Sequence, residues 1–392
     1  MKRMILFLAT IPLCLVLTSG VEAQRQNKQS APQRKASPSP QSTKQPTANQ
    51  PDHKSIHNPS PPSQIKHSVS VQAVQFSSNG KTLATWGADK VMRLWDLQTG
   101  KLIQTLTELG DSVAFAGMWG AGAFRISPDV KTLATWGANK EVKLWDLQTG
   151  KLKRTLAGHE FDVFEVAFSP DSKTMATADG QFYRASIKEK SGAVRLWDAE
   201  TGELKWTQEG PTALVCSVAF SPDGKTLASG HVEIARVQPR VLLWDVQTGK
   251  TKQDQERPFV FSVVFSPDGK MLAGGSVGSA SLSRFLEAAP FVQLWDAETL
   301  EIKQTLEDGS STVWPGATTV AFSLDGRTLV SYGEAAIGLS GEKKEKIRIW
   351  DVQAGKVKQT LEEYGPIAFT PDLKTFASRS DDKTVVKLSH VE

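Results

Sequence analysis

Two short patterns in the chain resemble catalytic motifs. Residues 274–278 read Gly-Gly-Ser-Val-Gly, the G-x-S-x-G pattern of a hydrolase nucleophile, with Ser276 at its centre. A nucleophile elbow needs a sharp strand-to-helix turn, whereas this segment opens a predicted β loop with no histidine candidate nearby. Residues 231–233 and 390–392 both read His-Val-Glu, but no downstream cysteine pair could hold the zinc of a deaminase. The sequence therefore predicts no catalytic residue.

Phosphate, metal and thiol chemistry are equally poorly supported. Gly-Lys-Thr occurs three times, but no copy has the glycine five residues earlier, or the following helix, that a phosphate-binding loop requires. After Lys66 only four histidines remain, too few and too scattered to predict a metal site, and we expect no cofactor. The one cysteine there, Cys216, lies in an alternating apolar run, which predicts a buried and unreactive thiol.

What the chain does contain is repetition. Residues 81–102 and 131–152 are identical at eighteen of twenty-two positions. A turn that ends in a basic residue, such as Ser-Pro-Asp-Gly-Lys, occurs seven times, and a Trp-Asp pair follows it six times. After the seventh turn, residues 387–392 fill the slot of the missing pair. A period of a few tens of residues indicates a repeat architecture.

Each repeat reads as four short strands. Alternating runs such as Val-Gln-Ala-Val-Gln-Phe have the period of two that a strand needs, and Pro-Asp-Gly after such a run favours a turn. The segments Thr-Leu-Ala-Thr-Trp-Gly, Val-Met-Arg-Leu-Trp-Asp and Lys-Leu-Ile-Gln-Thr-Leu supply three further strands. Because no helical periodicity occurs beyond the N-terminus, we expect an all-β fold.

This pattern resembles the WD-repeat (WD40) β-propeller family, in which each repeat is a four-stranded blade. The resemblance covers about residues 65–392 and implies a seven-bladed propeller within residues 64–392. Because the last repeat ends after its third strand, a short strand at residues 64–67 is expected to complete its sheet and cover the open edge. The repeats fall at about residues 67–106, 107–157, 158–208, 209–253, 254–306, 307–361 and 362–392.

The resemblance also implies a structural set of four hydrogen-bonded side chains inside a blade. In the first repeat the matching positions hold His67, Thr85, Asp89 and Trp95, which predicts a complete set. The third repeat has the histidine, threonine and tryptophan but an insertion where the aspartate is expected, and the others lack the histidine. These groups are expected to stabilise the fold because buried polar groups must satisfy one another.

The N-terminus differs in composition from the repeats. Residues 1–23 have a basic start, an apolar stretch and a small-residue cleavage site, which predicts a secretory signal peptide, although an uncleaved anchor is the alternative. Residues 24–63 are rich in Pro, Gln and Ser and predict a disordered basic linker. After Lys66 there are 37 basic and 40 acidic residues, so the net charge of +4 comes from the N-terminal part and predicts no nucleic-acid surface.

Length variation is confined to particular loops. From the basic turn residue to the tryptophan, repeats three to six are five to eleven residues longer than the first two, whereas the Trp-Asp turn never changes length. Because strands alternate in direction, the long loops should share one face, the usual place for a binding surface. Aromatic and arginine side chains on this face are the candidate partner contacts: Trp86, Trp136, Tyr183, Arg184, Arg236, Arg240, Arg284, Phe285 and Trp314.

These features predict an exported, periplasmic or extracellular, monomeric scaffold without enzyme activity. It would bind an unidentified protein partner through its long-loop face, with loops held rigidly so that docking costs little entropy. The alternative is an enzyme or a binder of a small glycan or peptide in the axial funnel of the propeller, although the first strands supply few polar groups for this. A third possibility is that the linker contacts membrane or cell wall electrostatically.

Overall fold

The computed structural model describes most of the repeat region. All of its strands belong to the compact unit His57–Glu392. In the described part every regular element is a β-strand, as expected, and none of it forms a helix able to span a membrane. The predicted signal peptide and nearly all of the predicted linker lie outside the described residues, which are 62–109, 124–137, 139–180, 192–210, 214–232, 239–257, 260–277, 290–307, 318–333 and 345–391.

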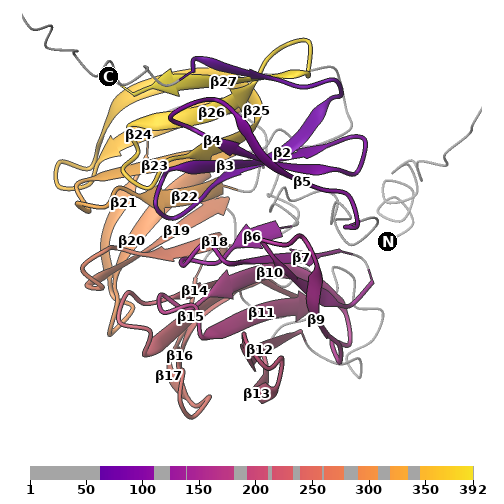
Figure 1. Cartoon of the computed structure of the whole chain (residues 1–392). Helices are drawn as coiled ribbons and strands as arrows, with labels where there is room; N and C mark the ends of the chain where they lie inside the picture. Colours follow the sequence, from indigo (N-terminus) through magenta and orange to yellow (C-terminus); the bar gives the residue numbers. More distant parts are fainter. Residues whose placement is uncertain are drawn as a thin grey trace, which may run out of the picture. The chain divides into compact units, whose positions relative to one another are not determined.

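The strands form successive antiparallel groups of four, and every group except the last is made by one stretch of chain (Figure 1). The first and second groups are separate four-stranded sheets. The predicted second strand of residues 82–87 is reproduced by β3, and the predicted outer strand by β5. These two groups are β2 (Val71–Phe76), β3 (Thr82–Gly87), β4 (Met92–Asp96) and β5 (Leu102–Leu106), then β6 (Phe124–Ile126), β7 (Thr132–Trp136), β8 (Val142–Asp146) and β9 (Leu152–Leu156).

The third to fifth groups repeat this order. A single pair, Gly180 with Leu214, joins the third and fourth groups into one eight-stranded sheet. The strands are β10 (Asp162–Phe168), β11 (Thr174–Gly180), β12 (Ala193–Asp198) and β13 (Leu204–Glu209), then β14 (Leu214–Phe220), β15 (Thr226–Val232), β16 (Arg240–Asp245) and β17 (Thr251–Glu256), then β18 (Val260–Phe265), β19 (Met271–Val277), β20 (Pro290–Asp296) and β21 (Ile302–Leu306).

The last two groups share a long strand, and the N-terminal strand completes the final group. The strand β25 pairs first with β24 and then with β26, while β1 pairs antiparallel with β27 through Ile65 opposite Val386. The expected strand near residues 64–67 therefore exists as Gln64–Lys66 and completes the sheet of the last group. These strands are β22 (Thr318–Phe322), β23 (Thr328–Gly333), β24 (Glu345–Asp351), β25 (Lys356–Phe369), β26 (Thr375–Arg379), β27 (Val385–His390) and β1 (Gln64–Lys66).

Apolar side chains between neighbouring groups build the core. Each cluster of buried residues joins two successive groups; for example, Leu94 and Leu106 of the first pack with Phe124 and Trp145 of the second. The cluster that holds Ile65, Val71 and Val386 joins the last group to the first. A four-stranded sheet buries both of its faces only when it has neighbours on both sides, so the groups depend on one another.

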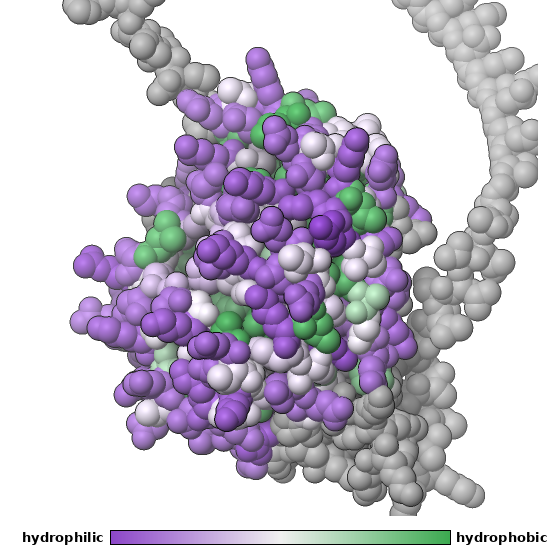
Figure 2. All heavy atoms as spheres, turned by 60° about the horizontal axis from the view of Figure 1, so that its bottom comes forward, coloured by the Kyte–Doolittle hydropathy of each residue, from purple (hydrophilic) through white to green (hydrophobic). Residues whose placement is uncertain are grey.

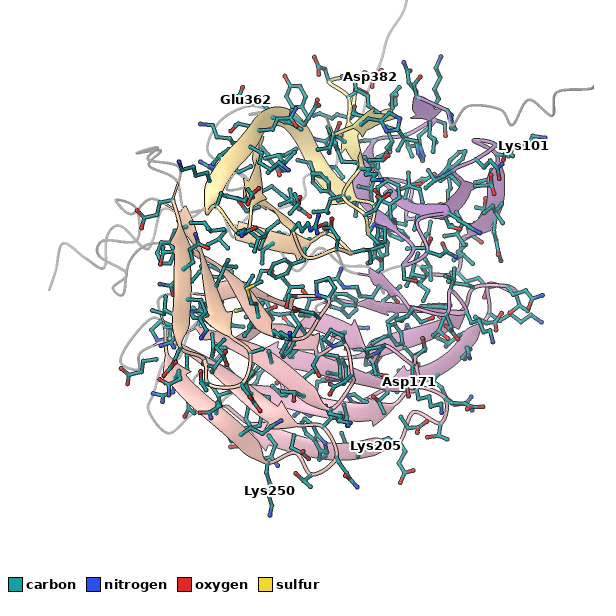
Figure 3. All side chains as sticks on the ribbon, turned by 90° about the vertical axis from the view of Figure 1, so that its left-hand side faces the viewer. Lys101, Asp171, Lys205, Lys250, Glu362 and Asp382 are labelled. Carbon is teal, nitrogen blue, oxygen red and sulfur yellow. The ribbon has the colours of Figure 1, made fainter. Side chains whose placement is uncertain are left out.

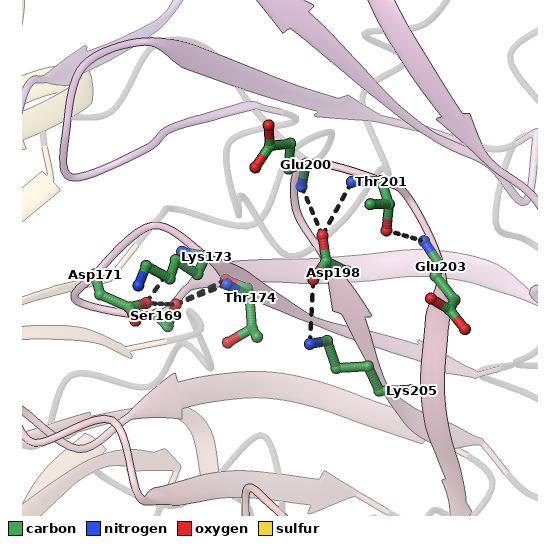
Figure 4. A network of polar contacts seen from close by, with 9 residues as sticks. All are labelled: Ser169, Asp171, Lys173, Thr174, Asp198, Glu200, Thr201, Glu203 and Lys205. Atoms are coloured by element: carbon green, nitrogen blue, oxygen red, sulfur yellow. Dashed lines mark hydrogen bonds and ion pairs between the residues drawn. The ribbon is translucent and has the colours of Figure 1, made fainter.

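The repeated turns keep their shape through side-chain hydrogen bonds. In each first-to-second turn a Ser or Thr hydroxyl donates to Asp or Asn two residues later at 2.6–2.7 Å. The same oxygen accepts from the backbone N–H five residues later, as from Thr174 to Ser169 at 2.9 Å (Figure 4). In the Trp-Asp turn of the third group, Asp198 accepts from the backbone of Glu200 and Thr201 (Figure 4). The constant spacing of these turns thus has a local cause.

Candidate functional site

The hairpins that carry the long loops of repeats four and five are longer than those of repeats one and two. Six residue pairs join β15 to β16 and seven join β19 to β20, whereas five join β3 to β4 and five join β7 to β8. The last pairs before these two loops are His231 with Arg240 and Val277 with Pro290. We call the end of the second strand and the start of the third strand, between which each predicted long loop runs, the loop base of that repeat.

Most of the predicted contact side chains belong to the loops themselves. Tyr183, Arg184, Arg236, Arg284, Phe285 and Trp314 lie outside the described residues.

Arg240 is the predicted contact residue that lies on a loop base in the described part. Its guanidinium forms ion pairs with Asp254 at 2.5 Å and Glu256 at 3.2 Å, and its side chain is 21% exposed. These two carboxylates raise the pKa of Arg240. Arg240 therefore holds β16 to β17, and a partner would meet an arginine already paired within the protein.

Trp86 and Trp136 are core residues, and this corrects their assignment to a partner surface. The exposed fraction is 2% for Trp86 and 0% for Trp136. Trp86 packs between the first and second groups, and Trp136 packs between the second and third beside Met175 and Trp197. An indole at the end of a second strand faces the neighbouring sheet, so its area stabilises the core and is not available to a partner.

A chain of polar side chains holds the third loop base together. His159 Nε2 lies 2.9 Å from Thr177 Oγ1, and the indole N–H of Trp197 donates to the same oxygen at 3.0 Å. Thr177 Oγ1 therefore bonds both the imidazole of His159 and the indole of Trp197. Burial lowers the pKa of His159 to about 4, so this ring is neutral at pH 7.

Asp179 and Arg195 form a buried ion pair at the same loop base. The Asp179 side chain is fully buried and that of Arg195 is 6% exposed. The carboxylate of Asp179 bonds Arg195 Nη1 and also accepts from the backbone N–H of Ala193 at 2.8 Å. Burial raises the pKa of Asp179 although Arg195 opposes this shift. The pair ties the end of β11 to the start of β12, on either side of the long loop.

The first repeat has a less complete set than its sequence predicts. Trp95 donates to Thr85 Oγ1 at 2.9 Å, but Asp89 forms its ion pair with Arg93 at 2.5 Å. His67 lies edge-on to Trp95, and neither of its ring nitrogens has a hydrogen-bond partner. The prediction of a fully bonded set in the first repeat is therefore wrong, because His67 bonds neither Thr85 nor Asp89, and Asp89 pairs with Arg93. The third repeat has the connected His-Thr-Trp chain.

The fourth repeat supplies a histidine that the sequence reasoning missed. His231 Nε2 lies 2.7 Å from Ser229 Oγ, which also accepts from Trp244 at 2.7 Å. The ring lies over Gly210, where a Cβ would be 2.5 Å from its Cε1. The signal was available, because residues two apart on a strand share a face, so Ser229 and His231 point the same way.

The buried histidines predict a loss of stability in mild acid. Burial lowers the pKa of His159 to about 4 and that of His231 to about 3, from 6.5. The unfolded chain therefore binds more protons below pH 6.5, so stability is full above that pH and falls as pH falls. We expect each histidine to lower the free energy of unfolding by about 2–3 kcal/mol between pH 7 and pH 4.5.

Urea unfolding across this pH range measures the effect. In a His159→Gln variant, the loss of stability on acidification should shrink by the part that His159 contributes, and the part that His231 contributes should remain. The groups that face His159 are Thr177, Trp197 and Arg195. Equal pH dependence in the variant and the natural chain would show that protonation of His159 is not coupled to unfolding.

The first strands of neighbouring groups pack side by side, where the predicted axial funnel would lie. Side chains here bond the backbone of the next first strand: Gln75 to Ile126 at 3.2 Å and Cys216 to Val260 at 3.1 Å are examples. Arg125 pairs with Glu165 at 2.6 Å, and this pairing raises the pKa of Arg125. In the described residues these side chains link one first strand to the next, and the opposite charges of Arg125 and Glu165 balance each other.

The catalytic patterns find no supporting geometry in the described residues. Ser276 lies within β19, where its backbone is paired with Val260 and Phe291, so no strand-to-helix elbow exists at this position. Burial raises the pKa of the Cys216 thiol, which keeps it protonated. No group of three or more potential metal-ligating side chains occurs in the part of the chain that the structure describes.

Comparison with known proteins agrees with the repeated four-stranded groups. The model of the WD40 family (WD domain, G-beta repeat) matches residues 61–96, 150–198 and 202–235. The chain contains WD40 repeats. Proteins with such repeats generally bind protein partners and are typically non-enzymatic scaffolds. The repeats of this chain are therefore of a type associated with protein interaction.

Curated relatives share the repeats over part of their length. Nuclear distribution protein PAC1 of Arthroderma benhamiae (strain ATCC MYA-4681 / CBS 112371) is 28% identical over 184 residues, 46% of this chain and 36% of that protein. The protein of the same name from Coccidioides posadasii (strain C735) is 32% identical over 189 residues, 47% of this chain and 37% of that protein. The chain thus spans a little over a third of the length of these relatives.

Proposed function

We propose that this protein is a non-enzymatic scaffold that binds a protein partner through the long loops of repeats three to six. The observation that carries the proposal is the design of the loop bases. The long loops of the fourth and fifth repeats begin on extended paired hairpins, and the base of the third is fastened by the buried Asp179–Arg195 pair. A rigid base reduces the conformational entropy that loops lose on docking.

The proposed architecture is a closed seven-bladed propeller in which each group of four strands is one blade. The pairing of β1 with β27 and the cluster that joins Ile65 to Val71 support closure between the last and first groups. In such a ring the long loops of neighbouring blades would stand side by side, so one partner could contact several of them.

We also propose that the protein is exported, to the periplasm or the extracellular space. The basic and apolar composition of residues 1–23 supports export, and residues 24–63 would serve as a spacer. The partner remains a macromolecule of unspecified identity. The PAC1 relatives carry a name that refers to nuclear distribution, and the export proposal places this chain in a different setting.

Replacing the long loops by short turns tests the scaffold proposal. In one variant the residues between Gly180 and Ala193 are replaced by Asn-Gly, a two-residue turn that suits a hairpin. Corresponding replacements between Val232 and Arg240, between Val277 and Pro290 and between Gly333 and Glu345 complete the set. Because the hairpins are retained, Tm should change little, while capture of partners from the native envelope should be abolished.

A matched control alters a turn on the opposite side of the same group. Exchange of Glu200, in the exposed Trp-Asp turn between β12 and β13, for Lys should leave capture intact. Undiminished capture by the loop-replaced variant would overturn the proposal. Capture lost equally in the control would show that the Trp-Asp turns, and not the long loops, form the binding surface.

The runner-up function, an enzyme or a binder of a small glycan or peptide, has one specific observation in its favour. Arg125, on a first strand, is 40% exposed at the side chain and could receive a carboxylate beside Glu165. An activity and binding screen against glycans, esters and peptides, with Arg125→Gln as the control, distinguishes it from the scaffold. Activity that disappears in this control would favour the runner-up.

A further inference from the structure

The outermost strand of a group presents an unpaired edge. Such an edge offers free backbone donors and acceptors to another chain, and proteins commonly protect it with lysine. In the described residues the strands β5, β9, β13, β17 and β21 end their sheets in this way, and so does β1. Figure 3 shows Lys101, Lys205 and Lys250, from the outer strands or the turns before them, projecting from the periphery.

Lysine occupies the same position on each of these edges except one. It stands eight residues after the tryptophan in the second to fifth groups, and β1 ends in Lys66. In the first group this position holds Ile103. The lysines are Lys153, Lys205, Lys252 and Lys303.

These lysines also make contacts within their own group. Lys153 and Lys252 donate to Thr132 and Thr226 of the second strand at 3.3 and 2.9 Å. Lys205 and Lys303 pair with the aspartate of the Trp-Asp turn at 3.1 and 3.5 Å, the first of which Figure 4 shows. A lysine at position 103 would find both partner types, Thr82 and Asp96, at the matching places in the first group.

The β5 edge is apolar and carries no charge. Leu102 is 47% exposed and Ile103 is 55% exposed, and the whole strand reads Leu-Ile-Gln-Thr-Leu. Elsewhere an exposed aliphatic such as Ile302 is followed directly by a lysine. On the face drawn in Figure 2, apolar side chains appear as separate spots among hydrophilic ones, so two adjacent exposed aliphatics are a local exception.

We propose that the edge of β5 is a self-association surface, to which β5 of a second copy of this chain adds in antiparallel orientation. A two-fold axis at Gln104 places Leu102 opposite Leu106 of the second copy and Ile103 opposite Thr105 of the second copy. Aliphatic and β-branched cross-strand pairs of this kind stabilise an antiparallel ladder. Symmetric pairing uses one patch on both copies, the usual arrangement of a dimer.

Charge favours self-pairing of β5 over self-pairing of β9, the outer strand of the next group. Self-pairing of β9 would bring Lys153 and Arg154 of both copies together, and like charges across a ladder are destabilising. The strand β5 has no such repulsion. This surface revises the expectation of a monomer and is independent of the long loops, so the scaffold proposal can fail without affecting it.

The chain's own linker is the competing occupant of this edge. Pro62 packs at the turn that leads into β5, where a Cβ on Gly100 would lie 2.9 Å from its Cγ. The residues between 23 and Pro62 include seven further prolines, and proline has no N–H to donate to a ladder, which makes this segment a poor added strand.

The test is the Ile103→Lys variant of the full chain. Sedimentation equilibrium over a concentration series, with reductant present, should show a monomer–dimer equilibrium for the natural chain. The variant should remain monomeric, so its mass at the highest concentration should be half that of the natural chain. Because the introduced lysine can contact Thr82 or Asp96, the variant should unfold at the Tm of the natural chain, so loss of association cannot be assigned to misfolding.

Ile302→Lys is the matched control, since Ile302 is equally exposed but its edge already carries Lys303. This control should dimerise like the natural chain. Hydrogen exchange should protect β5 amides at high concentration and not at low. Four results would each overturn the proposal: a monomeric natural chain, a dimeric Ile103→Lys variant, a monomeric control, or protection of the β5 amides at every concentration. The last result would indicate that the linker occupies the edge.

Discussion

Replacement of Gly274 by serine is expected to lower the free energy of unfolding by about 3 kcal/mol, because the fifth group has no space for a Cβ there. A Cβ on Gly274 would lie 2.1 Å from Cη2 of Trp295. Serine or threonine is the ordinary residue at this position, and Ser229 and Ser331 accept the indole N–H of their tryptophans. In the fifth group Trp295 bonds Gln293 at 3.3 Å and occupies that space instead.

Denaturant unfolding measures this effect, and Trp295→Phe provides the control. Phenylalanine lacks the outer indole atoms that serine would meet, so serine at position 274 should cost less than about 1 kcal/mol in the Trp295→Phe background. A Gly274→Ser chain as stable as the natural one would mean that Trp295 can turn to bond the new hydroxyl, as in the fourth and sixth groups.

Replacement of Asp179 by alanine is expected to cost about 3–5 kcal/mol, because it leaves the buried guanidinium of Arg195 without its partner. The matched replacement in the first group, Asp89→Ala, should cost about 1 kcal/mol or less. The two aspartates have equivalent arginine partners, but the side chains of Asp89 and Arg93 are 26% and 16% exposed, whereas Asp179 is fully buried. Solvent screens the first pair and not the second.

A second substitution separates the loss of the ion pair itself from the cost of leaving a buried charge unpaired. Met in place of Arg195 in the Asp179→Ala background removes the unpaired charge, so it should restore most of the lost free energy of unfolding. Equal losses for Asp179→Ala and Asp89→Ala would contradict the burial argument. Because this pair fastens the third loop base, the Asp179→Ala chain should also show faster hydrogen exchange at Gly180 and Ala193.

Burial and hydrogen bonding together explain why the third and fourth repeats carry polar groups in their interiors. Thr177 and Ser229 each bond a histidine and a tryptophan, so their oxygens are satisfied without water. Polar groups of this kind fix how the hairpin sits on its neighbours. The long loops begin directly beyond these positions, where a defined orientation favours recognition.

The sequence alone determined the repetition and its local structure. The turn marker and the Trp-Asp pair are local signals, because a Ser or Thr hydroxyl, a nearby Asp and a residue of positive φ such as Gly224 make each turn by themselves. Strand periodicity identified β3 and β5 within the repeats, and the short last repeat predicted the pairing of residues 64–67. The turns and the strands depend on neighbours in the chain, whereas the pairing of residues 64–66 with the last repeat followed from the strand that this repeat lacks.

Only the tertiary structure decided which side chains are available at the surface. Trp86 and Trp136 looked like rim residues because Gly or Ser is usual there, yet both are buried against a neighbouring sheet. Asp89 pairs with Arg93 and not with the other members of the expected set, and the side chain of His231, on a second strand, lies in the core. Exposure and pairing depend on sheets far apart in the chain, so spacing within one repeat cannot determine them.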